Sequence, residues 1–359
     1  MTIRLLTPCL TIMLVSCAIP TRTPPSSNPS TVAGSPRVSA PRSSGVRYLP
    51  RIATPQQQSA VAVLYEAGRS DNPLERANAI EMLEGQVEPL RQAVSKGLVD
   101  PNEGVRFAAA MAAARSDLCG VVDQIRPLTT DPSPSVRAAA IAALARCKTG
   151  IDQTPLAVMV LGTDRRVRAN AAMSLGEIGN PSAAAMLRAA MERPITNEDP
   201  MIVRISELEL AEALVRLGDR KQLETIRAAF FAPADQGELT ALAAQMAGRL
   251  DDTALAPAML TMATGEGPRK PGPELRLIIS EAVLRMWPEL APRLIPLAIE
   301  QSSNSMLEVR MQAAAVLGRD QSPVGEATLE RLLQDPAPRV RIAAAGAMLR
   351  RAGSPVPIR

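Results

Sequence analysis

The chain has 359 residues, of which 46% are hydrophobic and 2% aromatic, and it carries a formal net charge of +4 with no histidine. The lack of histidine excludes Ser-His-Asp triads, Cys-His pairs and His-ligated zinc sites. With one Trp, two Tyr and three Phe, the core must be built from Ala, Leu, Val, Ile and Met, which are mostly good helix formers.

Residues 1–16 have the features of an export signal. Arg4 gives a positive start, residues 5–15 are mostly apolar but too few to span a bilayer, and the segment ends in Leu14-Val15-Ser16-Cys17. This ending resembles the bacterial lipobox, in which the cysteine is acylated and becomes the new N-terminus. The resemblance implies a cleaved signal peptide over residues 1–16 and a lipid on Cys17. An ordinary secretory signal, or an apolar segment with a chance cysteine, is the alternative.

The position after the cysteine bears on the location of the protein. Ala18 is not the aspartate that, by resemblance to enteric lipoproteins, favours retention in the inner membrane. In a bacterium with two membranes we therefore expect an exported, lipid-anchored protein on the outer membrane, facing the periplasm. Display at the cell surface remains the alternative.

Residues 17–51 are predicted to be the lipidated cysteine followed by a disordered tether. Residues 18–50 include seven Pro, seven Ser and three Thr, with no acidic residue and no periodic apolar pattern. Such a segment buries too little surface to offset its ordering entropy. We expect it to hold a folded domain away from the membrane, with recognition of its proline-rich sequence as the alternative.

From residue 52 onward the chain repeats a phrase. Asp100-Pro-Asn-Glu-Gly-Val-Arg106, Asp131-Pro-Ser-Pro-Ser-Val-Arg137 and Asp335-Pro-Ala-Pro-Arg-Val-Arg341 each precede an alanine-rich run. Weaker copies place an equivalent residue at intervals of 30 to 36 residues along the chain. We call this residue the repeat position, and its nine occupants are Arg76, Arg106, Arg137, Arg168, Arg204, Thr240, Arg276, Arg310 and Arg341.

Each unit contains two helical patterns. An apolar residue stands seven positions after every repeat position, as a buried helical stripe requires. In the lead-in, Pro suits the first turn of a helix and the Asp just before it suits the N-cap. Two short helices cannot bury their apolar faces alone, whereas stacked pairs can. The sequence therefore predicts an all-α solenoid of about nine helix pairs over residues 52–359.

The phrase Asp-Pro-x-x-x-Val-Arg-x-x-Ala-Ala-x-Ala-Leu resembles HEAT repeats, in the short bacterial form related to phycobilin lyases. The tetratricopeptide signature is absent. In HEAT arrays the Asp and Arg form a structural ladder of hydrogen-bonded charges between successive second helices, which the resemblance implies here. An arginine stripe that binds phosphate or an acidic partner is the alternative. The expected ladder residues are Asp100, Arg106, Asp131, Arg137, Asp164, Arg168, Asp199, Arg204, Asp335 and Arg341, with each aspartate four to six residues before the arginine of its unit.

Cys119 and Cys147 follow the second helices of adjacent units. Adjacent repeats bring equivalent helix ends together, and an exported protein is in a compartment that permits disulfides. We expect these two cysteines to form a disulfide; two unpaired buried thiols are the alternative.

No enzyme motif is present: there is no Gly-x-Ser-x-Gly, Ser-x-x-Lys or phosphate-binding Gly-rich loop. We expect no catalytic residue, metal or cofactor. The expected function is a lipid-anchored, non-enzymatic scaffold that presents a curved surface to an envelope protein or peptide. A chromophore-lyase-like enzyme and a purely structural envelope protein are the alternatives.

The basic charge is local. Five arginines lie in or beside the tether, at positions 22, 37, 42, 47 and 51, and the first acidic residue is Glu66. From residue 52 onward 34 basic residues face 36 acidic ones, so the repeat array is mildly acidic. We therefore expect no nucleic-acid partner, and we expect the five arginines to add modestly to attraction toward anionic head groups.

Overall fold

The computed structural model describes residues 54–193 and 198–351, and every α-helix of this part has a counterpart in a repeating helix pair. The expected all-α solenoid of nine pairs is confirmed for these residues. Cys17, the expected signal peptide and the expected tether lie outside the described residues.

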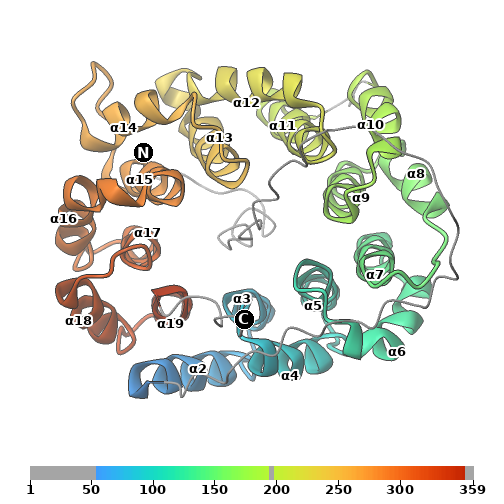
Figure 1. Cartoon of the computed structure of the whole chain (residues 1–359), viewed down its shortest axis with the longest axis horizontal. Coiled ribbons are helices and arrows are strands. Elements are labelled where there is room, and N and C mark those ends of the chain that lie inside the picture. Colours follow the sequence, from blue (N-terminus) through green and yellow to red (C-terminus); the bar gives the residue numbers. More distant parts are fainter. Residues whose placement is uncertain (1–53, 194–197, 352–359) are drawn as a thin grey trace, which may run out of the picture.

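One helix of each pair lies on the inside of a ring, and we call these the inner helices (Figure 1). Each of them contains one of the nine repeat positions. In chain order they are α3 (Pro73–Met82), α5 (Glu103–Arg115), α7 (Pro134–Arg146), α9 (Arg165–Ile178), α11 (Pro200–Arg216), α13 (Gly237–Arg249), α15 (Pro273–Met286), α17 (Leu307–Leu317) and α19 (Pro338–Arg351).

The other helix of each pair lies outside and covers the inner ring (Figure 1). Several of these outer helices are short and directly follow a 3₁₀ turn, and α6 has one on each side. They are α2 (Pro55–Ala67), α4 (Val87–Gly97), α6 (Val122–Ile125), α8 (Thr154–Val160), α10 (Ala184–Met191), α12 (Leu223–Phe230), α14 (Ala256–Thr264), α16 (Ala291–Gln301) and α18 (Pro323–Leu332).

The array closes on itself, which the repeat pattern does not predict. The last inner helix, α19, packs against α2 and α3 of the first pair (Figure 1). Each inner helix otherwise packs on the inner helices of the units before and after it. The first and last units therefore have neighbours on both sides, whereas an open solenoid leaves its terminal units half covered.

The residues that cap the inner helices α5 and α7 differ from those predicted from the lead-in phrases. Asn102, not Asp100, is the N-cap of α5, and Ser133, not Asp131, is the N-cap of α7. Each of these aspartates instead accepts a hydrogen bond from the backbone N–H two residues later, at 2.8 Å for Asp100 and 2.9 Å for Asp131. This local turn leaves the carboxylate free to bind across the repeat boundary.

Close contacts between neighbouring inner helices depend on small residues. A Cβ added to Gly248 of α13 would lie 2.9 Å from the Cβ of Ala282 in α15. One added to Gly318, just after α17, would lie 3.0 Å from the Cβ of Ala347 in α19. Because the alanines of the inner helices are buried on nearly every side, these helices pack closely without large side chains.

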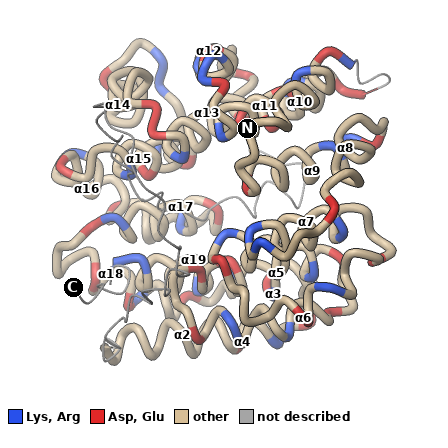
Figure 2. Tube along the Cα trace, turned by 45° about the vertical axis from the view of Figure 1, so that its right-hand side comes forward, with Lys and Arg blue, Asp and Glu red and all other residues tan. Residues whose placement is uncertain are grey.

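Charged side chains occur all around the ring. Figure 2 shows basic and acidic residues interspersed along it, which agrees with the near balance of charge from residue 52 onward. Among the described helices, none combines the length and apolar character needed to cross a bilayer.

Candidate functional site

Three repeat arginines bind the aspartate of the following unit. Arg106 donates to both carboxylate oxygens of Asp131, from Nε at 2.8 Å and from Nη2 at 3.0 Å. Arg76 with Asp100 and Arg310 with Asp335 have the same two-bond geometry, at 2.8 to 3.0 Å. These bidentate pairs tie consecutive units together and fix their relative orientation.

The third guanidinium nitrogen holds the unit's own lead-in turn. Nη1 of Arg106 donates to the backbone oxygens of Asp100 at 2.9 Å and Pro101 at 3.1 Å. Burial opposes ionisation of Asp131, but the hydrogen bonds from Arg106 and from the Ser133 N–H outweigh it and lower the pKa of this carboxyl. The arginine side chain thus binds the aspartate side chain of the next unit. Within its own unit it binds the backbone carbonyl of the aspartate and not its carboxylate.

Arg137 and Arg341 donate to the lead-in carbonyls of Asp131 and Asp335, and neither forms an ion pair with a described carboxylate. The expected ladder between successive units is therefore present at three boundaries, whereas Arg137 and Arg341 form no rung. In the three pairs above, the aspartate stands 24 or 25 residues after its arginine. The residue 25 positions after Arg137 is Gly162, so the chain supplies no carboxylate there. The prediction also missed Arg76 and Arg310, whose partner stands in the next unit.

The middle of the array departs further from the expected ladder. Asp164 and Asp199 cap α9 and α11, accepting from the N–H groups of Val167 at 2.9 Å and Met201 at 2.7 Å. Arg168 is buried and donates to the Ala190 carbonyl at 2.5 Å. Arg204 is exposed. These four residues form no ladder rung, because here the aspartate stands only four or five residues before the arginine and caps the helix itself.

Cys119 and Cys147 lie just after the ends of α5 and α7 and form a disulfide, with their Cα atoms 5.4 Å apart. Cys119 is exposed, so the bond lies at the surface and not in the core. It joins the ends of two adjacent inner helices on the side away from the ladder.

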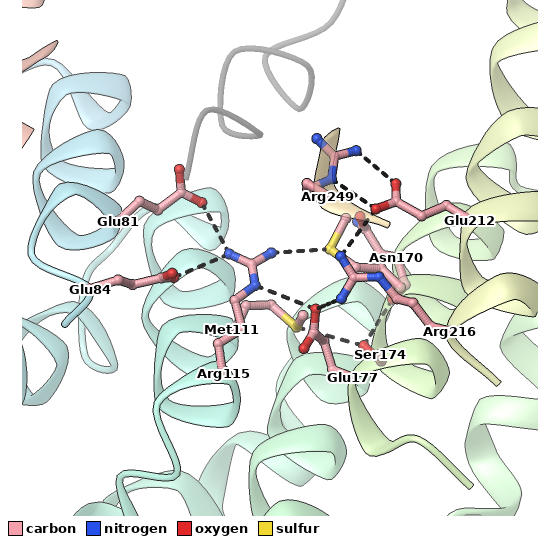
Figure 3. Close-up of polar contacts among 11 residues, drawn as sticks. Glu81, Glu84, Met111, Arg115, Asn170, Ser174, Glu177, Glu212, Arg216 and Arg249 are labelled. Carbon is pink, nitrogen blue, oxygen red and sulfur yellow. Dashed lines mark hydrogen bonds and ion pairs between the residues drawn. The ribbon is translucent and has the colours of Figure 1, made fainter. Parts of the chain in front are cut away.

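A second set of polar residues lies on one face of the inner helices. These residues stand two before, or two, five and nine after the repeat position, which places them on one stripe of a helix. Arg115 of α5 lies 3.7 Å from Glu177 of α9, past the intervening α7, so this stripe faces the inside of the ring (Figure 3). We call it the inward stripe.

At the C-terminal ends of the inner helices the stripe and its neighbours form a charged network. Arg115 contacts Glu84, just after α3, at 3.3 Å and Glu177 at 3.7 Å, and Glu177 accepts from Arg216 of α11 at 2.5 Å (Figure 3). Glu212 then joins Arg216 at 3.1 Å to Arg249 of α13 at 2.7 and 2.8 Å.

The network resumes on the next helices. Glu281 of α15 accepts from Arg319, just after α17, at 2.8 and 3.0 Å and lies 3.4 Å from Arg285. Arg350 of α19 donates to the Met82 sulfur of α3 at 3.8 Å, across the closure of the ring. The charged network on the inside of the ring thus has two stretches, one from the end of α3 to α13 and one from α15 to the residue after α17.

Electrostatics separate two kinds of carboxyl on these helices. The pKa values of Glu212 and Glu281 are lowered to about 2. Burial favours the neutral acid in both, but the arginines around each carboxylate outweigh this effect. In contrast, burial raises the pKa of Glu209 to about 7, against a weaker opposing effect of Arg165. Burial likewise raises the pKa of Glu274, and the nearby Glu308 raises it further.

The inward stripe also holds most of the buried side-chain atoms that lack a hydrogen-bond partner in the described structure. Buried polar atoms without partners are rare, and each one indicates a missing ligand or strain. Nine residues of the stripe have such an atom, namely Asn78, Glu81, Ser206, Glu209, Glu274, Arg285, Gln312, Arg339 and Arg350.

Two cavities lie near the ring closure. The larger, of about 330 Å³, is bounded by α2 and the start of α3 on one side and by Pro338, Arg341 and Ile342 of α19 on the other. The smaller, of about 60 Å³, lies among α2, α3 and α4 beside the Arg76–Asp100 pair. Among the described residues, no group of three or more Cys, Asp or Glu side chains is placed to hold a metal ion.

A family model of HEAT repeats matches residues 60–145, 87–165 and 122–199. These matches overlap, so residues 60–199 consist of HEAT repeats, and the described helix pairs continue the same arrangement to Arg351. The class of fold is therefore a HEAT-repeat α-solenoid. No curated protein matches the chain.

Solved structures give distant likenesses. An engineered protein is 16% identical, with 83% of this chain and 94% of that chain covered and a TM-score of 0.32. Human deoxyhypusine hydroxylase in complex with glycerol is 18% identical, with 76% and 98% covered and a TM-score of 0.35. Kap121p is 13% identical, with 83% of this chain but 38% of that chain covered and a TM-score of 0.34. Because these scores are low, the assignment of repeats rests on residues 60–199 and on the helix pairs themselves.

Proposed function

We propose that this protein is a lipid-anchored, non-enzymatic scaffold of the bacterial cell envelope, which binds a segment of a partner protein on its inward stripe. The observation that carries the proposal is the set of buried polar atoms on this stripe that lack partners among the described residues. A bound polypeptide supplies both donors and acceptors, and can therefore satisfy such atoms along its length.

The rigid frame around the stripe supports the same proposal. The ladder pairs, the charged network and the ring closure hold the inner helices in fixed positions. A pre-ordered surface loses little conformational entropy on binding, which favours a scaffold. A lipid on Cys17 would hold this scaffold at a membrane through residues 18–51.

In-cell photo-crosslinking tests the binding surface. A crosslinking amino acid replaces Gln245, on the inward stripe of α13, or Glu330, an exposed residue of α18 that serves as the control. We expect one protein to be captured from Gln245 and from a second inward position, Gln312, but not from Glu330. Capture of the same proteins from all three positions, or of none from the inward pair, would contradict the proposal.

Metabolic labelling with an alkyne fatty acid tests the anchor. We expect the label to be incorporated into the protein and to be lost in Cys17→Ser, which should also leave the membrane fraction. Cys9→Ser is the matched control, since Cys9 lies inside the expected signal peptide and should not affect labelling of the mature chain. Equal labelling of the two variants would count against a lipid on Cys17.

A further inference from the structure

Three consecutive inner helices each place a glutamate on the inward stripe in their first turn. Glu238 of α13, Glu274 of α15 and Glu308 of α17 all stand two residues before their repeat position. Because the position is equivalent in neighbouring units, the three carboxyls form a row, which we call the acidic row. None of the three lies within ion-pair distance of a basic side chain of the described residues.

The helix dipole by itself does not explain the acidic row. A carboxylate in the first turn of a helix is stabilised by the N-terminal N–H groups, which lowers its pKa. Here burial raises the pKa of Glu238, and burial followed by the charge of Glu308 raises that of Glu274. Glu274 is only 7% exposed, and its Oε1 accepts no hydrogen bond from the described structure.

Independent acceptors beside the row point to a ligand rich in donors. Gln312 of α17 is 6% exposed, stands four residues after Glu308 on the same stripe, and has an Oε1 atom without a partner. Ser206 of α11 is 5% exposed and has an unpartnered Oγ. A guanidinium has five N–H donors and no acceptor, and is therefore the side chain best suited to carboxyl and amide oxygens arranged in this way.

The chain itself contains a segment of that chemistry. Residues 18–51 include five arginines and no acidic residue, and they stand shortly before Thr54, the N-cap of α2. An inner helix of 14 residues is about 21 Å long, whereas 34 extended residues reach about 110 Å, so the segment is long enough to run past the whole length of an inner helix. Covalent attachment gives such a segment an effective concentration on the order of millimolar.

We propose that the arginine-rich segment of residues 18–51 binds the acidic row of its own chain and occupies the inward stripe until a partner displaces it. The proposal adds regulation to the binding surface described above and rests on that surface being a binding site. The occupant is thus an arginine-rich, acid-free polypeptide held in cis. The same chemistry defines the partner able to compete with it.

Limited trypsin digestion of the full chain in detergent tests the docking, because trypsin cleaves after the arginines at 37, 42, 47 and 51. We expect cleavage there to be roughly tenfold faster in Glu238→Gln/Glu274→Gln/Glu308→Gln than in the wild type, as three weak ion pairs are lost. The matched control is Glu289→Gln/Glu300→Gln/Glu330→Gln, which removes three exposed outer carboxyls and should cleave like the wild type. Equal rates in all three proteins would overturn the proposal.

A photo-crosslinker at Tyr48 gives a second measurement that does not depend on the stability of the triple variant. We expect links from position 48 to peptides containing the acidic row. Mixing isotopically light and heavy protein shows which chain supplies the segment. Links within one isotope support binding in cis. Links between light and heavy chains would show that a second copy supplies the segment and would overturn the proposal. A failure here with successful capture from Gln245 would leave the scaffold function standing and remove only its regulation.

Discussion

Gly346 of α19 lies directly against Met82 of α3, and a Cβ added to this glycine would lie 2.9 Å from the Met82 Cβ. This contact joins the last unit to the first, residues that are far apart in sequence but adjacent in the ring. The neighbouring Arg350 reaches the sulfur of the same methionine at 3.8 Å. The closure of the ring therefore depends on the absence of a side chain at position 346.

Gly346→Leu should open or strain this closure. Overpacking of a fitted contact costs about 1–3 kcal/mol, and the better helix propensity of Leu recovers only about 1 kcal/mol of that. We expect a lower thermal midpoint and a larger radius of gyration by small-angle scattering. Gly120→Leu is the control, because a Cβ at Gly120 meets nothing within 4 Å. An unchanged radius together with unchanged stability would show that the closure is not limited by this contact.

Arg106→Ala should destabilise the protein more than Arg137→Ala. Both arginines hold the carbonyls of their own lead-in, but only Arg106 also binds a carboxylate, that of the buried Asp131. Removing Arg106 leaves this carboxylate without its partner, so we expect a difference of about 2 kcal/mol in the free energy of unfolding. Denaturant titration measures the difference, and equal losses would contradict a structural role of the rung.

Glu209→Gln should stabilise the protein above neutral pH. Folding raises the pKa of Glu209 from about 4.5 to about 7. The stability that the protonated side chain contributes to the fold is therefore fully present below pH 4.5 and is lost as the pH rises through about 7. A shift of this size corresponds to at most about 3 kcal/mol. Unfolding measured at pH 4 and at pH 8 should show the gain of the variant at pH 8 only. A gain that is equal at both pH values would contradict the assignment.

Glu212 and Glu281 should have the opposite pH dependence. Their folded-state pKa values are about 2, below the unfolded value near 4.5, so the stability they contribute is present above pH 4.5 and lost as the pH falls toward 2. We expect Glu281→Gln to lower stability at pH 7 and to flatten the fall in stability between pH 4.5 and 2. Parallel acid-unfolding curves for wild type and variant would argue against this.

The Cys119–Cys147 disulfide should stabilise the protein through the unfolded chain. Its cysteines are 28 residues apart, and closing a loop of that length removes entropy worth about 3–4 kcal/mol from the unfolded state. We expect Cys119→Ser/Cys147→Ser to lower the thermal midpoint, and a reductant to lower that of the wild type but not of the variant. Alkylation of both thiols in native, unreduced protein, detected by mass spectrometry, would show that the bond does not form.

The number of units and the positions of their second helices could be predicted from the sequence. Each repeat position precedes an apolar residue by seven, and this local periodicity persists because every unit packs on its neighbours in the same way. The partners of the ladder could not be predicted with the same success. Arg310 has no aspartate six residues before it, yet it binds Asp335 of the next unit, because the guanidinium crosses the repeat boundary.

The sequence by itself determined the class of fold, since a helical apolar stripe recurring every 30 to 36 residues has no other way to be buried than by stacking. Only the tertiary structure decided that the stack closes. Closure depends on the small rotation added by each unit and on the fit of Gly346 to Met82, neither of which is visible in a local pattern. The inward stripe has the same origin: Glu238, Glu274 and Glu308 look like ordinary first-turn acids until the ring places them in one row.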